Sequence, residues 1–355
     1  MCYFPIKILN KRFLPTRKNG YNPPECPDER LRYITAECGH CFECRKKRRN
    51  MWRVRMKEQK KDTPVGVFFT GTVKPERYEE IKNKYNLNDD NDIATKIVRL
   101  FLERIRKETG KSIKHWIVTE KGHTNTRRIH IHGLFFDTAG IGKYNLERLL
   151  KRNWIDGYSY NGYSTSEKCI NYISKYMTKR DDVNPEFIGK VLASPGLGEG
   201  YTERKRKYHT YHGENTHEEY MNYNGTTETL PRYYKEKLWT EEERQELWII
   251  KENKGIKWIG RQKFNTNSEE GRQWYENCLE EHNRGGAALH NDKIEEILIK
   301  KLINQREKRK ERAKKYIKVY GHFLRQRINS DQKFAKDIEQ FKEYMNSEEY
   351  TFLRV

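Results

Sequence analysis

Two histidines separated by one residue, His130 and His132, have a spacing that indicates metal chemistry. Side chains of a β-strand alternate between its two faces, so both imidazoles would lie on the same face. Glu120, at the end of another strand-like segment, offers a carboxylate. Two imidazoles and a carboxylate, with positions left open for phosphate oxygens, suit Mg²⁺ or Mn²⁺. Taken alone, such a pair is more often two hydrogen-bonded or solvent-facing histidines.

Two tyrosines four residues apart, Tyr172 and Tyr176, would share one face of a helix. Each is followed three residues later by a lysine, Lys175 and Lys179. A phenol with a pKa of about 10 is a weak nucleophile at neutral pH. A nearby ammonium group and a metal ion at the attacked phosphate would both favour its reaction. The alternative is that the two rings only pack the helix against its neighbours.

The segments around these side chains predict strands alternating with amphipathic helices, from their β-branched and aromatic content or their helical apolar spacing. Strands are expected at 65–73, 115–120 and 128–136, and helices at 92–108 and 145–154. The two later strands should form a hairpin. The helix that carries the tyrosines should begin at Ser164, because Ser164 and Glu167 have the spacing of a capping box.

Three of the seven cysteines, Cys38, Cys41 and Cys44, form two overlapping C-x-x-C spacings. In a cytosolic protein this spacing indicates a metal knuckle rather than disulfides. Zinc takes four nitrogen or sulfur ligands. Candidates for the fourth ligand are Cys2, Cys26 and His40. The alternative is a cluster of reduced thiols without metal. The isolated Cys169 and Cys278 are expected to be packing residues.

The segment 45–61 follows the cysteines and has ten basic residues among seventeen, with one acidic residue. It contains neither Gly nor Pro, so a helix is expected. Such a density of like charge favours contact with phosphates over a merely solvated face. The candidate DNA-binding residues are Arg45, Lys46, Lys47, Arg48, Arg49 and Arg53.

The composition agrees with a polyanionic partner. The 355 residues include 72 Lys and Arg against 51 Asp and Glu, a net charge of +21, which favours nucleic acid over a charge that serves only solubility. Aromatic residues make up 12% of the chain, which argues against a disordered protein. No apolar run approaches the length of a membrane span, and no secretory signal is recognisable, so a soluble cytosolic protein is expected.

The order of these motifs resembles the HUH endonucleases that start rolling-circle replication. The resemblance rests on Phe68-Phe69-Thr70-Gly71-Thr72, then Glu120, His130-Ile131-His132 and the doubled Tyr-x-x-Lys. More specifically, the chain is similar to replication initiators of small single-stranded DNA phages, the gokushovirus-like Microviridae. That similarity adds the N-terminal cysteines and the runs 194–198 and 230–234, and covers roughly residues 1–240. Gly71 departs from the pattern, where an apolar residue is common.

The resemblance implies an α+β fold, an RRM-like antiparallel sheet with helices on one face. It implies that His130, His132 and Glu120 hold Mg²⁺ or Mn²⁺, and that Tyr172 and Tyr176 attack DNA to form a 5′-phosphotyrosine. Lys175 and Lys179 would neutralise the phosphate or orient a hydroxyl. The implied substrate is single-stranded DNA at the phage origin, in the host bacterial cytoplasm, with host helicase and polymerase as partners.

Two other functions stay open at this point. One is a non-catalytic nucleic-acid-binding protein with a zinc knuckle and an RRM-like sheet, and the other is a different HUH enzyme, a relaxase or a transposase. The four expected parts of the chain are a Cys-rich and basic segment at 1–62, the endonuclease core at 63–180, an irregular segment at 181–240, and a helical basic extension at 241–355. The tyrosines of the third part are expected on a surface where bases stack. Long helices are expected at 292–327 and 331–345.

Overall fold

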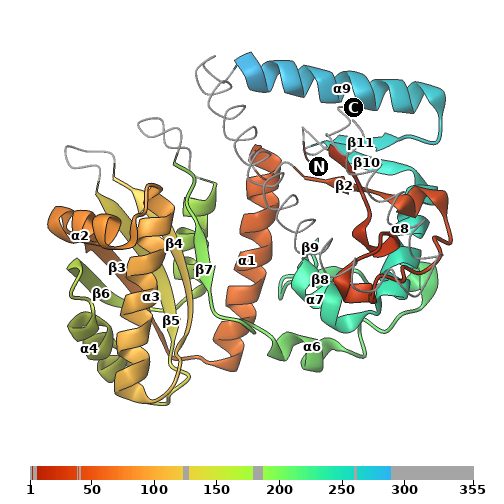
Figure 1. Cartoon of the computed structure of the whole chain (residues 1–355). Helices are drawn as coiled ribbons and strands as arrows, with labels where there is room; N and C mark the ends of the chain where they lie inside the picture. Colours follow the sequence, from red (N-terminus) through yellow and green to blue (C-terminus); the bar gives the residue numbers. More distant parts are fainter. Residues whose placement is uncertain are drawn as a thin grey trace, which may run out of the picture. The chain divides into compact units, whose positions relative to one another are not determined.

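The protein is described by a computed structural model that covers residues 2, 6–37, 39, 41–122, 128–178, 187–259 and 262–288 (Figure 1). Cys38, His40, Lys179 and the two helices expected at 292–327 and 331–345 lie outside the described residues. The chain divides into two compact units, one of Arg45–Asn253 and one of Met1–Cys44 with Lys254–Val355. The four-part division expected from the sequence stays a prediction.

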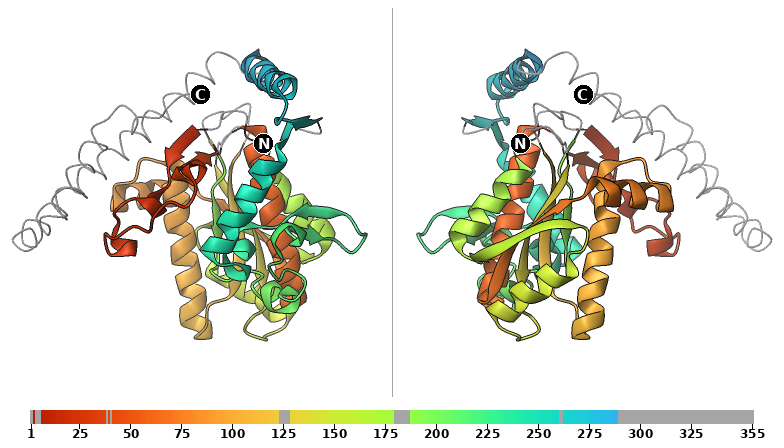
Figure 2. Two further views of the ribbon diagram at one scale, coloured as in Figure 1. Left: turned by 90° about the vertical axis from the view of Figure 1, so that its right-hand side faces the viewer. Right: turned by 90° about the vertical axis from the view of Figure 1, so that its left-hand side faces the viewer.

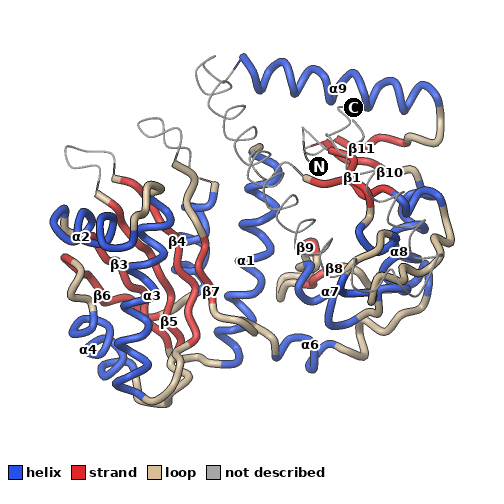
Figure 3. The backbone as a smooth tube through the Cα atoms, in the orientation of Figure 1, coloured by secondary structure: helices blue, strands red, loops and turns tan. Residues whose placement is uncertain are grey.

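A sheet of five antiparallel strands is the centre of the first unit, in the order β6-β3-β5-β4-β7 (Figure 3). Its strands are β3 (Gly66–Val73), β4 (Lys114–Lys121), β5 (Ile129–Phe136), β6 (Gly157–Ser164) and β7 (Val191–Ala193). The three strands expected from the sequence are therefore confirmed, including the β4–β5 hairpin. The expected α+β class with an antiparallel sheet is confirmed as well.

Three helices cover one face of this sheet, and two of them were expected from the sequence. They are α2 (Pro75–Tyr85), α3 (Asp90–Thr109) and α4 (Lys143–Asn153). Alternate residues of the strands, such as Phe69 and Phe135, are buried against Phe101 of α3 and Leu150 of α4. The side chain of Asp89 caps the start of α3 by accepting hydrogen bonds from two backbone N–H groups. This face forms the larger apolar core.

The opposite face of the sheet is also covered in part, by α1 (Phe42–Asp62) and α5 (Glu167–Ser174). Phe68, Trp116 and Leu134 point to this side and pack with Met56 of α1 and Ile173 of α5. Figure 2 shows α1 and α3 on opposite sides of the strands. The helices expected on one face are thus joined by two more on the other.

A second core lies between α1 and the segment that follows the sheet. It gathers Val54 of α1 with Tyr201, Tyr220, Leu230, Tyr234, Trp239 and Leu247. Short elements form this segment, namely α6 (Gly200–Lys205), β8 (Glu219–Met221), β9 (Thr227–Thr229), α7 (Arg232–Leu238) and α8 (Glu241–Lys254). The expectation of an irregular segment with base-stacking tyrosines is therefore wrong for its buried tyrosines. Their hydroxyls have protein partners, such as Glu58 for Tyr220.

The second unit contains two short antiparallel strand pairs. One joins β1 (Ile6–Leu9) to β2 (Tyr33–Ala36), and the other joins β10 (Ile256–Ile259) to β11 (Gln262–Asn265). Helix α9 (Glu269–Ala288) follows, and its Cys278 is buried with Ile259 and Phe264. Across the described ranges, none of the helices has the length and apolar character that crossing a bilayer requires.

Candidate active site

The sheet face that carries Phe68 and Leu134 becomes polar toward one end. Strand pairing places Thr70 beside His132 and Thr72 beside His130, and it places Glu120 beside His130 from the other neighbouring strand. Because side chains alternate along each strand, these five residues project from the same face. The register therefore brings together residues that lie up to about sixty positions apart in the sequence.

Hydrogen bonds orient both imidazoles. Nδ1 of His132 lies 3.2 Å from Oγ1 of Thr70, and Nδ1 of His130 lies 2.9 Å from Oγ1 of Thr72. Nε2 of His132 lies 2.8 Å from Oε2 of Glu120. With Nδ1 donating to a threonine, each ring has the tautomer that offers Nε2 to a metal ion.

The donor set suits a hard divalent cation. Two ligand atoms at neighbouring positions of an octahedral Mg²⁺ lie about 3 Å apart, close to the His132–Glu120 separation. A Cβ atom on Gly122 would lie only 2.9 Å from Nε2 of His130, so the glycine keeps the space at that nitrogen open. The ligand atoms of these three residues do not all lie within 4.8 Å of one another, a closeness that the cysteine cluster described below does reach. Binding of one ion by all three therefore requires His130 or its partners to shift.

The helix α5 positions the two tyrosines beside this polar end. Its N-cap is Ser166, whose hydroxyl accepts a hydrogen bond from the Cys169 N–H, so the expected start at Ser164 is wrong. Ser164 instead ends strand β6. Tyr172 lies in the last turn of α5, and Tyr176 lies in the short 3₁₀ helix Lys175–Met177 that continues it. The two hydroxyl oxygens are 3.0 Å apart.

The ring of Tyr176 stacks on the imidazole of His132, with centroids 4.2 Å apart and planes inclined by 14°. Tyr172 contacts Phe68 edge to face and is about half exposed. Burial, the hydrogen bond from Tyr172 and the charge of Glu120 raise the pKa of the Tyr176 hydroxyl. That hydroxyl therefore keeps its proton at neutral pH and requires activation for nucleophilic attack. Lys175 is exposed on the same turn.

The basic segment expected to contact DNA forms helix α1, and much of its charge has partners inside its own unit. Arg53 pairs with Glu228 at 2.5 Å. The guanidinium of Arg55 lies 4.5 Å from the ring centre of Trp52 and 3.9 Å from that of Tyr233. Of the residues predicted to contact DNA, Lys47 and Arg48 are exposed, whereas Arg45, Lys46, Arg49 and Arg53 are partly buried.

The cysteines expected to bind zinc are also brought together in part. Cys2, Cys41 and Cys44 are buried side by side. Cys26 lies outside this group, and its thiol donates to the backbone oxygen of Asp28 at 3.1 Å. Cys169 and Cys278 pack against apolar cores, as expected.

Sequence reasoning did not assign a role to Thr70, Thr72 or Gly122. The threonines were visible in the FFTGT run, and their alternation puts them on one face of a strand. Their pairing with the histidines depends on the register between β3 and β5, which the sequence alone does not reveal.

Residues 67–181 match the family model for the replication-associated protein ORF2. The match covers about a third of the chain, from the start of β3 to just past the second tyrosine, and includes Glu120, both histidines and both tyrosines. It supports a replication-associated role that involves DNA. No curated protein and no solved structure matches the chain.

Proposed function

We propose that the protein nicks and rejoins single-stranded DNA to initiate rolling-circle replication. In this proposal, Tyr172 and Tyr176 are the nucleophiles, and Glu120, His130 and His132 hold Mg²⁺ or Mn²⁺. The family match over residues 67–181 supports the replication-associated part of the proposal. The observation that carries the catalytic part is the contact between the His132 ring and the Tyr176 ring, 4.2 Å between centroids, because it puts a nucleophile beside a metal ligand.

The reaction needs no external energy source. The tyrosine oxygen bonds to phosphorus as the bond between phosphorus and the 3′ oxygen breaks; the hydroxyl loses its proton and the leaving oxygen gains one. One phosphoester bond is formed and one is broken, so a later attack by a DNA 3′ hydroxyl restores the strand. When bound, the divalent ion supplies positive charge at the scissile phosphate. Lys175 adds charge from the same turn, and Lys179 is proposed to do the same.

Two neighbouring tyrosines allow the strand to be passed from one to the other. With hydroxyl oxygens 3.0 Å apart, both reach nearly the same position. While one tyrosine holds the 5′ end, the other is available to cut the regenerated origin. We propose the origin of a small single-stranded DNA phage as the substrate, in the host bacterial cytoplasm, with host helicase and polymerase completing replication. The exposed Lys47 and Arg48 are then the foremost candidates on α1 for phosphate contacts.

The direct test is the covalent adduct. The full chain is incubated with labelled single-stranded oligonucleotides that tile the cognate circular genome, with Mn²⁺ or with EDTA. A slower-migrating species should form on denaturing gels with Mn²⁺ only. Mass spectrometry of the digested adduct should place the nucleotide on Tyr172 or Tyr176.

Three variants sharpen this test. Tyr172→Phe with Tyr176→Phe should abolish the adduct, whereas Tyr144→Phe, exposed on α4 across the sheet, should retain it. An adduct in the double variant would refute the nucleophile assignment. Salt-sensitive binding of the oligonucleotides by the wild-type chain, without any adduct, would favour the non-catalytic alternative.

A further inference from the structure

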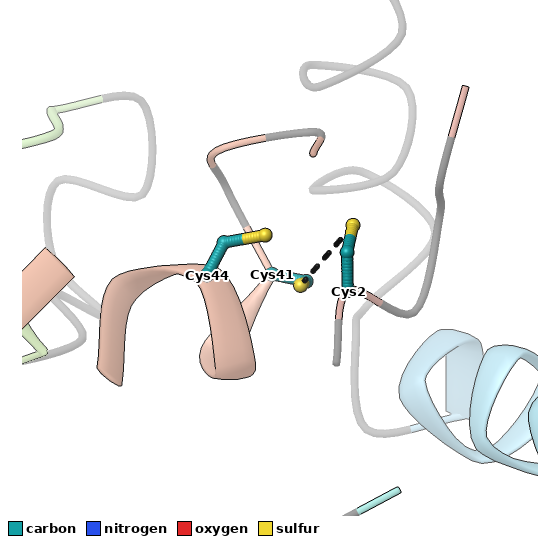
Figure 4. A group of neighbouring side chains, drawn as sticks. All are labelled: Cys2, Cys41 and Cys44. Carbon is teal, nitrogen blue, oxygen red and sulfur yellow. Dashed lines mark hydrogen bonds between the residues drawn. The ribbon is translucent and has the colours of Figure 1, made fainter. Parts of the chain in front are cut away.

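Three cysteines from two distant parts of the sequence meet in the second unit. Cys2 precedes β1, whereas Cys41 directly precedes α1 and Cys44 lies in its first turn. Their side chains are 2%, 9% and 5% exposed. Figure 4 shows Cys41 and Cys44 extending from the start of α1 toward Cys2.

The pairing of β1 with β2 explains how residue 2 reaches residue 41. The strands are antiparallel, and Ile6 is opposite Ala36. The chain before Ile6 and the chain after Ala36 therefore leave the ladder at the same end. Cys2 lies four residues before Ile6 and Cys41 five residues after Ala36, so the hairpin brings the two thiols to the same place.

The distances match tetrahedral zinc better than a disulfide. The sulfur atoms of Cys2 and Cys41 are 4.0 Å apart, and all three sulfurs lie within 4.8 Å of one another. A disulfide requires about 2.05 Å between sulfurs. Zinc–sulfur bonds of about 2.3 Å at tetrahedral angles place two thiolates about 3.8 Å apart. Small movements of the three side chains are thus enough for zinc binding.

Simple packing of apolar thiols is a weaker explanation. Among the residues that the structure describes, no aliphatic or aromatic side chain joins the three cysteines in their buried cluster. By contrast, Cys278 is buried with Ile259 and Phe264, which is how a packing cysteine is usually surrounded. Three sulfurs that meet without an apolar core favour a metal ion as the element that holds them.

We propose that Cys2, Cys41 and Cys44 bind a structural Zn²⁺ as thiolates. Each thiol loses its proton on binding, so uptake of zinc releases protons. Zinc takes a fourth ligand, and no other described His, Cys, Asp or Glu belongs to this group. The ion would tie the N-terminal residues to the first turn of α1 and close a loop of about forty residues. This site uses none of the residues of the proposed active site.

The first measurement is the metal content of the full chain, purified with a reductant and without added metal. We expect about one zinc per chain. The second is native labelling with iodoacetamide, with and without a zinc chelator, followed by peptide mass spectrometry. The chelator should speed the alkylation of Cys2, Cys41 and Cys44 at least about tenfold, since thiolates bound to zinc are protected. Labelling of Cys26 and Cys169 should not change.

Labelling of the wild-type chain avoids reliance on variants that fail to fold. As a supplement, Cys2→Ser should lose the zinc, and Cys26→Ser should keep it. A reduced chain that binds neither Zn²⁺ nor Co²⁺ would overturn the proposal, as would rapid alkylation of the three thiols before chelation. Because the readout is thiol protection, its failure leaves the DNA-nicking proposal intact. Conversely, absence of a DNA adduct leaves the zinc site intact.

Discussion

The indole of Trp154 lies against Gly71 in β3, in the space that a side chain at position 71 would take. An ideal Cβ on Gly71 would lie 2.6 Å from Cζ2 and 2.7 Å from Cε2 of that ring. Trp154 also contacts Phe69 and Phe101 edge to face, so the indole has little room to move. The glycine in the FFTGT run is therefore explained by packing on the helix-covered face of the sheet, and not by the chemistry on the other face.

Gly71→Ala should lower the free energy of unfolding by about 1–3 kcal/mol, because the core is overpacked. Urea denaturation followed by tryptophan fluorescence measures this change. The loss should be smaller in a Trp154→Phe background, where the ring is smaller. Gly162→Ala is the matched control, since a Cβ there meets only the Tyr160 ring and hydroxyl at ordinary contact distances. Equal stability of Gly71→Ala and Gly162→Ala would show that Trp154 does not restrict position 71.

Gly122→Ala should weaken metal binding while the fold is kept. The added methyl group would lie 2.9 Å from Nε2 of His130, the atom that is proposed to bind the ion. We expect the affinity for Mn²⁺ to fall at least about tenfold, measured by electron paramagnetic resonance of free Mn²⁺. Gly162→Ala again serves as the control. Wild-type affinity in Gly122→Ala would remove His130 from the proposed ligand set.

Thr70 and Thr72 are expected to act as positioning residues for the histidines. Valine has the shape of threonine but cannot accept the hydrogen bond from Nδ1, so the imidazoles lose their fixed tautomer and orientation. The Thr70→Val, Thr72→Val double variant should bind Mn²⁺ about 10–100-fold more weakly. The exposed Thr138→Val should bind it normally. If the double variant binds Mn²⁺ as the wild type does, the threonines have no role in positioning.

Substitutions of Tyr176 should separate its ring from its hydroxyl. Tyr176→Phe keeps the stack on His132, so Mn²⁺ affinity should hardly change, while any DNA adduct at position 176 is lost. Tyr176→Ala also removes the ring, and a stacked pair contributes about 0.5–1.5 kcal/mol, or about a 2- to 10-fold loss of affinity. Titration of both variants with Mn²⁺ tests this. Equal affinities in the two variants would show that the stack does not support His132.

The strands and the site residues could be predicted where a local pattern determines them. Alternation places His130 and His132 on one face, and the four-residue spacing brings Tyr172 and Tyr176 together even though the α-helix ends at Ser174. Strand β6 was not predicted, because its GYSYNGYS sequence is poor in β-branched residues and lies at the edge of the sheet.

The exact role of helix α1 could not be predicted from its charge. Its mostly basic sequence indicates a solvated or DNA-bound helix, but single apolar residues place it between two cores, Met56 toward the sheet and Val54 toward the tyrosine-rich segment. The long stems of its basic residues cover the surroundings, and partners distant in sequence, such as Glu228 for Arg53, neutralise some of the charge. Such pairings depend on tertiary contacts that no local pattern contains.

Glu58 of α1 should make stability depend on pH. Its carboxylate is 1% exposed and accepts hydrogen bonds from Lys61, Tyr220 and Arg204 at 2.5, 2.6 and 2.8 Å. Burial alone would raise the pKa of Glu58, but these three hydrogen bonds outweigh it and hold the pKa below its usual value. The folded state therefore binds this proton less readily than the unfolded state does. The stabilisation is complete above the unfolded pKa of about 4.3 and is lost as pH falls through the folded pKa.

Glu58→Gln should accordingly lower the free energy of unfolding at pH 7 by about 1–3 kcal/mol, the contribution of hydrogen bonds to a charged group. The difference from wild type should shrink as the pH falls below about 4, where the wild-type carboxylate takes up its proton. Urea denaturation between pH 3.5 and about 7 measures both. Glu103→Gln, which removes an exposed carboxylate paired with Lys107, should change stability by at most about 0.5 kcal/mol throughout. A constant difference between wild type and Glu58→Gln at every pH would mean that the charge of Glu58 does not stabilise the contact between α1 and the tyrosine-rich segment.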